Sequence, residues 1–153
     1  MRRPIEFVIV WSLLFLGVFI GFPLGLNTIN HILCALGWAL FALGSFVHYL
    51  SHKAHPKAHE DTKAIDYIAT QGVYSWVRHP GYLGLMLMFF GVAIAFGSIP
   101  ALIIALLLTI HHYLLAVKEE RSMLEKFGDS YAKYMEKVPD RLLPLRKFFR
   151  RRR

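Results

Sequence analysis

The sequence predicts an all-α integral membrane protein with four transmembrane helices and a further helical segment after the last of them. Hydrophobic residues make up 56% of the 153 positions, which exceeds the share typical of a soluble domain. They gather in four stretches that are free of lysine and arginine, and these cations flank the stretches and give a formal net charge of +8. A chain of this length has room for one domain, so we expect a single membrane domain.

The four apolar stretches cover residues 7–26, 29–50, 82–96 and 101–117, and a helix needs about 20 apolar residues to cross the hydrocarbon layer. The third stretch is short, and the turn sequence Gly-Ser-Ile-Pro follows it at residues 97–100. We therefore expect the last two helices to form a tight hairpin. Within the single domain, 1–153, we place the first two spans in residues 1–50, a loop in residues 51–81, and the region expected to carry a functional site, with its tail, in residues 82–153.

The placement of lysine and arginine predicts the orientation in the membrane, because short cytoplasmic loops collect these residues. They occur before the first stretch, between the second and third, and after the fourth, whereas residues 27–30 and 97–100 contain none. We therefore expect both termini and residues 51–81 on the cytoplasmic side, in the plasma or inner membrane if the source is prokaryotic. The basic run at residues 150–153 favours contact with anionic lipid headgroups over nucleic-acid binding.

Small residues recur at helical spacing within the first two stretches. Gly17, Gly21 and Gly25 follow one another every fourth residue, and Gly37 and Gly44 are seven positions apart. On a helix such residues share a face, where they let a neighbouring backbone approach closely. We assign them to helix packing and not to chemistry.

A polar stretch leads into the third predicted helix and contains Arg78-His79-Pro80-Gly81-Tyr82. Proline is favoured in the first helical turn, so we place Pro80 at the first helical position and His79 at the cap. The backbone amides that follow would point out of the helix, where they can bind a carboxylate or phosphate, and Gly81 would let that ligand come close. The alternative is that Arg78 and His79 only face lipid headgroups.

The fourth helix is expected to end with Lys118, Glu119, Glu120 and Arg121, directly after its apolar run. Two acids in the last turn oppose the helix dipole, which favours cations there, so a cationic ligand would compensate. The alternative is a solvated acid pair that Lys118 and Arg121 screen.

Taken together, these residue types permit S-adenosylmethionine as a ligand without singling it out. The amides and His79 would bind its carboxylate, and Glu119 would bind its ammonium group or ribose hydroxyls. The aromatic side chains of Tyr74, Trp76 and Tyr82 would contact the adenine or the sulfonium, where a cation–π contact contributes on the order of 1 kcal/mol.

A histidine-rich tract and one cysteine are the remaining candidates for metal chemistry. His48, His52, His55 and His59 would align on an unbroken helix, but Pro56 interrupts that helix. We therefore favour an interfacial polar cluster over a metal site, although a metal-binding tract stays open. Cys34 lies alone in an apolar run, so we expect a core residue and no disulfide.

The motifs resemble a family, the isoprenylcysteine carboxyl methyltransferase and phospholipid methyltransferase group of integral membrane enzymes. The resemblance covers about the last two thirds of the chain. It rests on Gly72-Val73-Tyr74, on Arg78-His79-Pro80-Gly81-Tyr82-Leu83-Gly84, on Glu119-Glu120, and on Phe127-Gly128, Tyr131, Tyr134, Val138-Pro139, Arg141 and Pro144. The combination is far more specific than any one of its pieces.

This resemblance implies S-adenosylmethionine as the cofactor and a lipid or lipid-like methyl acceptor that enters from the bilayer. It implies that the cofactor is held by Tyr74, His79, Pro80, Gly81, Tyr82 and Glu119, with Ile68 and Ala69 lining its binding site. We add Glu120 to this set as the neighbour of Glu119. Our catalytic candidates are Arg141, which could orient an anionic acceptor group, and His112, because ionisable residues within a span are often functional.

Two alternatives compete with this interpretation. NADPH-dependent membrane sterol reductases share much of the C-terminal signature, but they typically carry asparagine at the place of Gly81 and are longer. In a non-catalytic membrane protein, the same polar residues would lie at the ends of the spans without a role in a reaction. One departure bears on the acceptor: Leu115 stands where the eukaryotic prenylcysteine enzymes carry an arginine, which argues against a prenylcysteine carboxylate.

Overall fold

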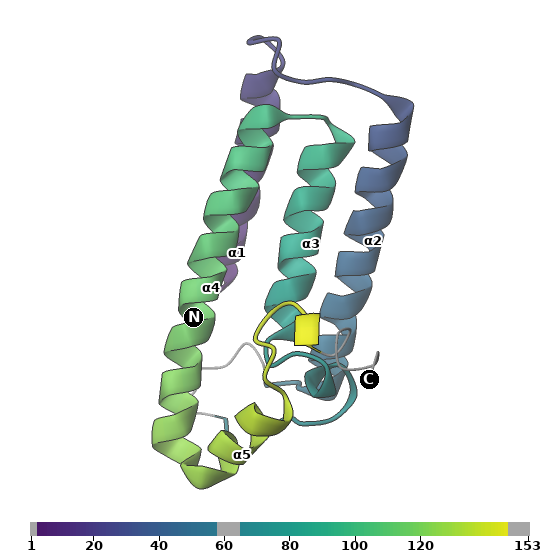
Figure 1. The fold of residues 1–153 in the computed structure, drawn as a ribbon. Helices are drawn as coiled ribbons and strands as arrows, with labels where there is room; N and C mark the ends of the chain where they lie inside the picture. The colour runs from purple at the N-terminus through teal and green to yellow at the C-terminus, as the bar shows by residue number, and fades with distance from the viewer. Residues whose placement is uncertain (1–2, 58–64, 147–153) are drawn as a thin grey trace. The chain divides into compact units, whose positions relative to one another are not determined.

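The structure, a computed structural model, describes residues 3–57 and 65–146 and is all-helical over these residues (Figure 1). The predicted all-α class is therefore confirmed. The helices are α1 (Arg3–Gly21), α2 (His31–Ala54), α3 (Pro80–Ala95), α4 (Ile99–Phe127) and α5 (Asp129–Lys137), with the short 3₁₀ helix η1 (Gly72–Ser75) before α3.

Two of these helices, α2 and α4, are long and apolar enough to cross a membrane. The helices α1 and α3 are apolar but shorter, and the 16 residues of α3 span roughly 24 Å at 1.5 Å per residue, less than the hydrocarbon layer of about 30 Å. The side chains of α1, α2 and α4 include many large exposed apolar residues, as expected for helices that face lipid. Four complete spans therefore remain a prediction.

The first helix ends earlier than its apolar run. The run was expected to be helical over residues 7–26, but α1 ends at Gly21. Pro23 explains the difference, because proline restricts the residue before it to extended conformations and cannot donate to the helix.

The fourth helix ends later than predicted. It continues past the expected end at Arg121 to Phe127, and Gly128 follows with a positive φ of 51°, which glycine adopts readily. The added turns are held by packing, since Met123 is buried and Phe127 lies against the same apolar cluster. Glu119 and Glu120 thus lie in the helix interior, and the argument from the helix dipole at its last turn was wrong.

The chain forms two compact units, to which α2, α3 and α4 each contribute residues. The first unit comprises Met1–Ser45 and Leu85–His111, and the second comprises Phe46–Gly84 and His112–Arg153.

In the first unit, apolar side chains of α1, α3 and α4 form one core. Its buried members are Val10, Leu14, Val18, Phe89, Val92, Ala93, Ala101, Ala105 and Leu108. Glycines bring the helices close, since a Cβ on Gly37 would overlap the backbone of Gly91 and one on Gly17 would meet the backbone of Ala101. The packing role predicted for Gly17 and Gly37 is confirmed, whereas Gly25 lies in the turn after α1 with φ of 66°.

The two connections of the first unit pair with each other at one end of its helices (Figure 1). The amide of Thr28 donates to the carbonyl of Gly97, and the amide of Ile99 donates to that of Leu26, both at 3.1 Å. Gly97 has φ of 51°, and the carbonyl of Thr28 fills the place of a Cβ. Only residues 96–98 connect α3 to α4, so the predicted tight hairpin between these two helices is confirmed.

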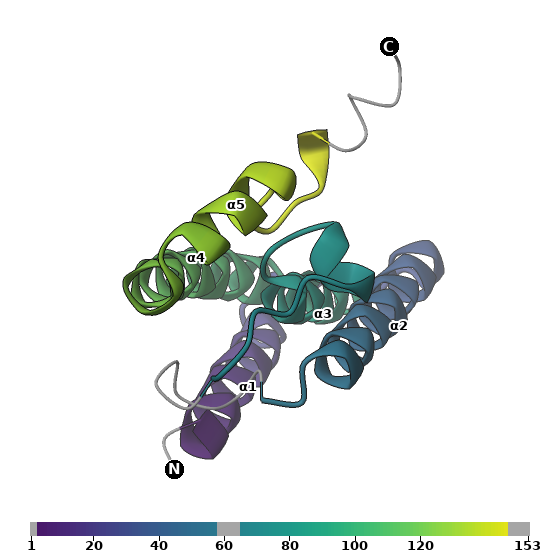
Figure 2. The same ribbon diagram turned by 90° about the horizontal axis from the view of Figure 1, so that it is seen from below.

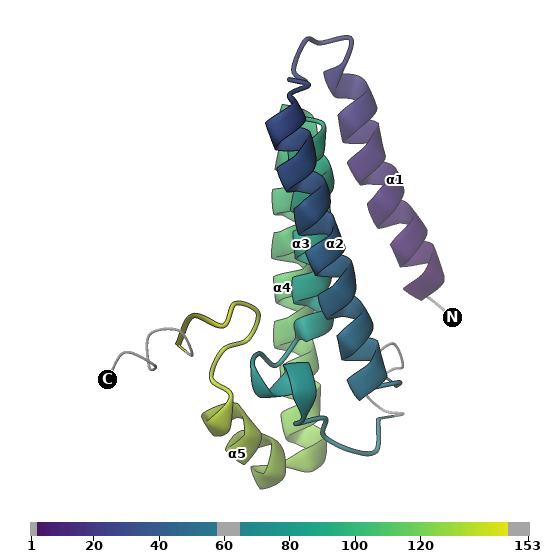
Figure 3. The ribbon, with the colours of Figure 1, turned by 90° about the vertical axis from the view of Figure 1, so that its right-hand side faces the viewer.

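Most of the charged side chains among the described residues belong to the second unit. Its apolar cluster consists of Ile65, Met123, Tyr131, Tyr134 and Val138, with Ile68 packed against it. Figure 3 shows α5 turning back from the end of α4, and Figure 2 shows η1 at the start of α3 on the same side as α5. The predicted helical segment after the fourth helix is thus present.

Candidate functional site

The start of α3 is held by a pairing between two loop segments of the second unit. The helix begins at Pro80, as predicted, and the amide of Leu83 makes the first helical bond to the carbonyl of His79. The amides of Arg78 and His79 donate to the carbonyls of Asp140 and Arg141, each at 3.0 Å. This pairing brings Arg141 beside the residues before α3.

Arg78 lies inside the protein, with 7% of its surface exposed. Its Nε donates to Oε1 of Glu120 at 2.7 Å, and its Nη1 donates to the carbonyls of Val138 and Pro139, both at 2.8 Å. A side chain that faces lipid headgroups would be exposed, so the headgroup alternative is wrong for Arg78. The residue instead ties α3, α4 and the chain after α5 together.

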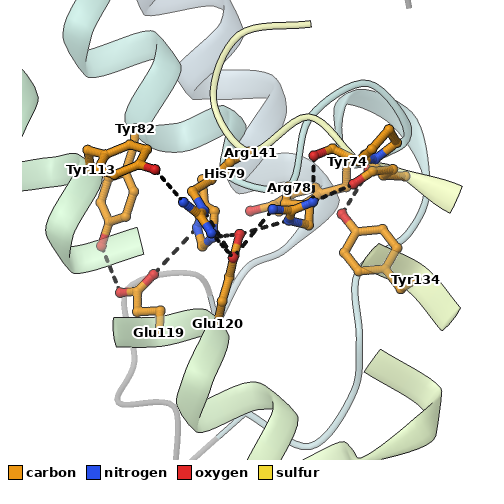
Figure 4. A network of polar contacts seen from close by, with 11 residues as sticks. Tyr74, Arg78, His79, Tyr82, Tyr113, Glu119, Glu120, Tyr134 and Arg141 are labelled. Atoms are coloured by element: carbon orange, nitrogen blue, oxygen red, sulfur yellow. Dashed lines mark hydrogen bonds and ion pairs between the residues drawn. The ribbon is translucent and has the colours of Figure 1, made fainter. Parts of the chain in front are cut away.

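Glu120 is the centre of the network (Figure 4). Arg78 and Arg141 both donate to its carboxylate, the Nη2 of Arg141 at 2.8 Å, and the Nε2 of His79 lies 3.2 Å from it. Only 3% of Glu120 is exposed, so the solvated-pair alternative is wrong for this acid. Because two guanidinium groups flank it, its charge is compensated inside the protein.

Glu119 contacts the other side of the same imidazole. Its Oε2 lies 3.6 Å from Nδ1 of His79, and its Oε1 accepts a hydrogen bond from the hydroxyl of Tyr82 at 2.7 Å. The ring of Tyr82 stacks on His79 with an interplanar angle of 14°. With a quarter of its side chain exposed, Glu119 is the more accessible of the two acids.

The two catalytic candidates lie next to this group. Arg141 donates to the hydroxyl of Tyr113 at 2.7 Å besides its contact with Glu120, and its guanidinium lies over the Tyr113 ring. His112 is buried and meets the ring of Tyr82 edge-on at a centroid distance of 5.3 Å. Its neighbour His111 belongs to the first unit, where it pairs with Glu6.

Tyr74 and Gly81 belong to a second group of contacts. The hydroxyls of Tyr74 and Ser51 lie 3.0 Å apart, and the carbonyl of Tyr74 accepts from the hydroxyl of Tyr134. Burial raises the pKa of Tyr74, so its hydroxyl stays protonated near neutral pH. A Cβ on Gly81 would lie 3.1 Å from the Ser51 Oγ, so this glycine lets α2 and α3 approach.

Four other predicted residues belong to the same unit. Pro80 is buried, Ile68 packs against the apolar cluster, and Ala69 is half-buried in the loop before η1. Trp76 is exposed. The structure thus brings together His79, Tyr82, His112, Glu119, Glu120 and Arg141 from the predicted set.

The side chains of the histidine tract do not form one cluster among the described residues. His48 and His52 are neighbours on α2, whereas Nδ1 of His55 lies 2.7 Å from the hydroxyl of Tyr67. His59 lies outside the described residues. Within residues 3–57 and 65–146, no group of three histidine, cysteine or acidic side chains is placed to hold a metal ion.

Arg78 is the functional candidate that the sequence interpretation missed. Its neighbour His79 was selected for its place at a helix start, but the partner of Arg78 lies 42 positions away. The sequence held one signal of this ion pair: an arginine precedes the third helix, and two adjacent acids lie on the next helix.

A sequence model of one protein family matches residues 32–130, about two thirds of the chain, and its description is phospholipid methyltransferase. The chain belongs to this family. The match includes the start of α3 and the acid pair of α4, and it ends before Arg141.

Several relatives of known name are similar to this family member. The protein-S-isoprenylcysteine O-methyltransferase of Schizosaccharomyces pombe is 34% identical over 47% of the chain and 31% of its own length. The methanethiol S-methyltransferase of Pseudomonas deceptionensis is 31% identical over 73% of the chain and 44% of its own length. The human protein-S-isoprenylcysteine O-methyltransferase is 27% identical over 69% of the chain and 35% of its own length. The chain therefore spans less than half the length of each of these relatives.

Proposed function

We propose that the chain is a methyltransferase that uses S-adenosylmethionine and methylates a lipid or lipid-like acceptor at the cytoplasmic face of a membrane. Membership in the phospholipid methyltransferase family supports a methyl-transfer reaction. The observation that carries the proposal is the group formed by His79, Tyr82 and Glu119, because it offers aromatic faces and an accessible carboxylate beside one helix start.

The chemistry of these side chains fits the cofactor. S-adenosylmethionine would supply a methyl group already activated on a sulfonium, together with an amino-acid end that carries both charges. The carboxylate of Glu119 suits the ammonium group or ribose hydroxyls, and the first-turn amides of α3 with His79 suit the carboxylate. The rings of Tyr82 and His79 suit a cation that stacks on an aromatic face.

The remaining polar residues then have supporting roles. Arg78 and Arg141 compensate the charge of Glu120, so that Glu120 can hold His79 in place from one side while Glu119 faces it from the other. Holding the methyl donor and the acceptor in line can lower the activation free energy by on the order of 7–11 kcal/mol in well-oriented reactions. Positioning of the two reactants is therefore the main task of the protein. We place His112, which lies against Tyr82, nearest to the acceptor.

The acceptor class follows from the exposed apolar faces of the helices and from the relatives. The relatives are named for a prenylated cysteine and for methanethiol, so sulfur-containing and lipid-like acceptors are the first to test. Both guanidinium groups of the network already contact Glu120. This engagement, together with Leu115, favours an acceptor without a carboxylate.

Calorimetric titration of the detergent-purified protein tests the cofactor. We expect S-adenosylhomocysteine to bind at one site per chain and NADPH not to bind. Binding of NADPH without S-adenosylhomocysteine would replace the proposal by the reductase alternative, and binding of neither would refute an S-adenosylmethionine enzyme. Transfer of a labelled methyl group to membrane lipid extracts or to small thiols then identifies the acceptor.

A further inference from the structure

Two histidines near the end of α2 face each other one helical turn apart. His48 and His52 are four positions apart, so their side chains share one face of the helix. Their Nε2 atoms lie 3.2 Å apart, and the rings are set edge to face. Both side chains are half-buried and lie near the end of α2 that the predicted topology places on the cytoplasmic side.

The second nitrogen of His48 is already fixed by the backbone. Its Nδ1 lies 3.1 Å from the carbonyl oxygen of Gly81, which can only accept, so Nδ1 carries the proton. The lone pair of the neutral ring is then on Nε2, which points toward His52. Histidines that bind metals are oriented in this way, with one ring nitrogen donating to a carbonyl or carboxylate and the other facing the metal.

The distance between the two Nε2 atoms suits a shared metal ion. Zinc binds imidazole nitrogen at about 2.0–2.1 Å, so two such ligands at a tetrahedral angle lie roughly 3.3–3.4 Å apart. The observed 3.2 Å is close to that separation. Without a metal, His52 donates its Nε2 proton to His48. With a metal, that proton moves to Nδ1 of His52, and the ring remains neutral.

We propose that His48 and His52 form a binding site for a divalent transition metal, with Zn²⁺ as the first candidate and water in the remaining coordination positions. Structural zinc sites use four protein ligands, so a site with two imidazoles predicts an ion that exchanges with solution. The bound ion would also fix His48 against Gly81, in the first turn of α3. This metal site does not rest on the proposed methyl transfer.

Metal titration of the purified full-length protein, produced without a histidine tag, tests this proposal. We expect one Zn²⁺ per chain by calorimetry, and Co²⁺ to give the intense visible absorption of a tetrahedral site. His48→Ala and His52→Ala should each weaken Zn²⁺ binding more than tenfold. His31→Ala, at the exposed opposite end of α2, is the matched control and should bind as the unchanged protein does.

A thermal-shift measurement separates loss of the site from loss of the fold. Zn²⁺ should raise the unfolding temperature of the unchanged protein and of His31→Ala, since a ligand that binds only the folded state stabilises it. His52→Ala retains the contact between His48 and Gly81 and should fold without that rise. Zn²⁺ binding that persists in His52→Ala, or that is lost only in His55→Ala, would overturn the proposal.

Discussion

Arg78 and Glu120 form a buried ion pair whose energetic balance depends on their other partners. Removing two charges from water costs several kcal/mol per ion, and mutual attraction alone repays this only in good geometry. Here Arg78 also donates to two carbonyls, and Glu120 also accepts from Arg141. The pair therefore links the start of α3 to α4 and to the chain after α5. These links hold in place the residues that we propose contact the cofactor.

We expect Arg78→Ala to destabilise the protein by about 3 kcal/mol, the low end of the cost of breaking a buried ion pair, because Arg141 still compensates Glu120. Reversible unfolding in mixed micelles measures the change. Arg121→Ala, an exposed cation on the same helix as Glu120, is the control and should change stability by less than about 0.5 kcal/mol. Equal effects of the two substitutions would show that the pair of Arg78 and Glu120 contributes no more to stability than an exposed cation does.

Glu119 is where the proposed cofactor site is most directly tested. We expect Glu119→Gln to weaken binding of S-adenosylhomocysteine by about 1.5–3 kcal/mol, the contribution of a hydrogen bond to a charged group. The fold should survive, because Glu119 is the more exposed of the two acids. Glu125→Gln, exposed on the same helix, should bind normally. Unchanged binding by Glu119→Gln would remove this acid from the site.

His79 lies between both acids, so its substitution distinguishes binding from catalysis. Transfer from a sulfonium needs no general acid at the cofactor end, so we expect His79→Ala to raise KM for S-adenosylmethionine more than it lowers kcat. Steady-state kinetics at varied cofactor concentration measures both. Normal cofactor binding with a loss of turnover of about 10²-fold or more would instead assign His79 as a general base.

At the level of single residues, the sequence predicts correctly those positions that depend only on the neighbouring residues. The placement of Pro80 follows from its missing amide, and the choice of His79 follows from Pro80. No local rule predicts the burial of Arg78. The local sequence around an arginine before a helix at a membrane border is the same whether its side chain contacts lipid headgroups or an internal acid. Only its partner Glu120, far along the chain, decides between the two.

At the level of elements, hydropathy marks the apolar runs but not the helix ends. It extended α1 past Pro23, where the backbone rule for proline limits the helix. Hydropathy also predicted too early an end for α4, because residues 118–127 are largely polar. Their helix depends on the packing of Met123 and Phe127 against α5. Both errors arise where local backbone chemistry or tertiary packing outweighs composition.

The attachment of α5 should depend on pH. Burial raises the pKa of Tyr131 and of Tyr134 above the ordinary value of 10.0. The unfolded chain therefore loses these protons first, so the stability they contribute is present below pH 10 and is lost as the pH rises above that value. Alkaline unfolding followed by circular dichroism measures the loss of stability. Other tyrosines of the chain are exposed, so the signal of Tyr131 and Tyr134 is the difference in tyrosinate absorbance between the unchanged protein and the double variant Tyr131→Phe, Tyr134→Phe. That difference should appear together with unfolding, and a difference that develops well before unfolding would contradict the burial of these hydroxyls.

Tyr134→Phe separates the titrating hydroxyl from the ring. The substitution removes the hydrogen bond from Tyr134 to the carbonyl of Tyr74 and should cost about 1–3 kcal/mol near neutral pH, because that carbonyl is left unsatisfied. It should also reduce the dependence of stability on alkaline pH. Tyr49→Phe, exposed on α2, is the control and should alter neither property.

At the scale of the whole molecule, the number of spans decides where the site lies. If only α2 and α4 crossed the bilayer, the turn after α1 and the start of α5 would lie on the same side, but the connections before α2 and α4 would lie on opposite sides, contrary to the hydrogen bonds of Thr28 to Gly97 and of Ile99 to Leu26. If α1 and α3 cross as well, the turn after α1 and the start of α5 lie on opposite sides. The distribution of lysine and arginine favours the second arrangement, since all of them lie outside the connections at residues 27–30 and 97–100.

Cysteine labelling distinguishes the two arrangements. In a Cys34→Ala background, Leu24→Cys places a thiol in the exposed turn after α1, and Ser130→Cys places one at the exposed start of α5. Neither position carries a contact that the fold needs, whereas Ser98 is fully buried and Asn30 accepts from the first amides of α2. With four spans, an impermeant maleimide added to intact cells should label the thiol at position 24 and reach position 130 only after permeabilisation. Equal labelling of both positions would contradict four spans and the pairing of the two connections. The reverse pattern would place the acid pair on the outer face, contrary to the charge distribution.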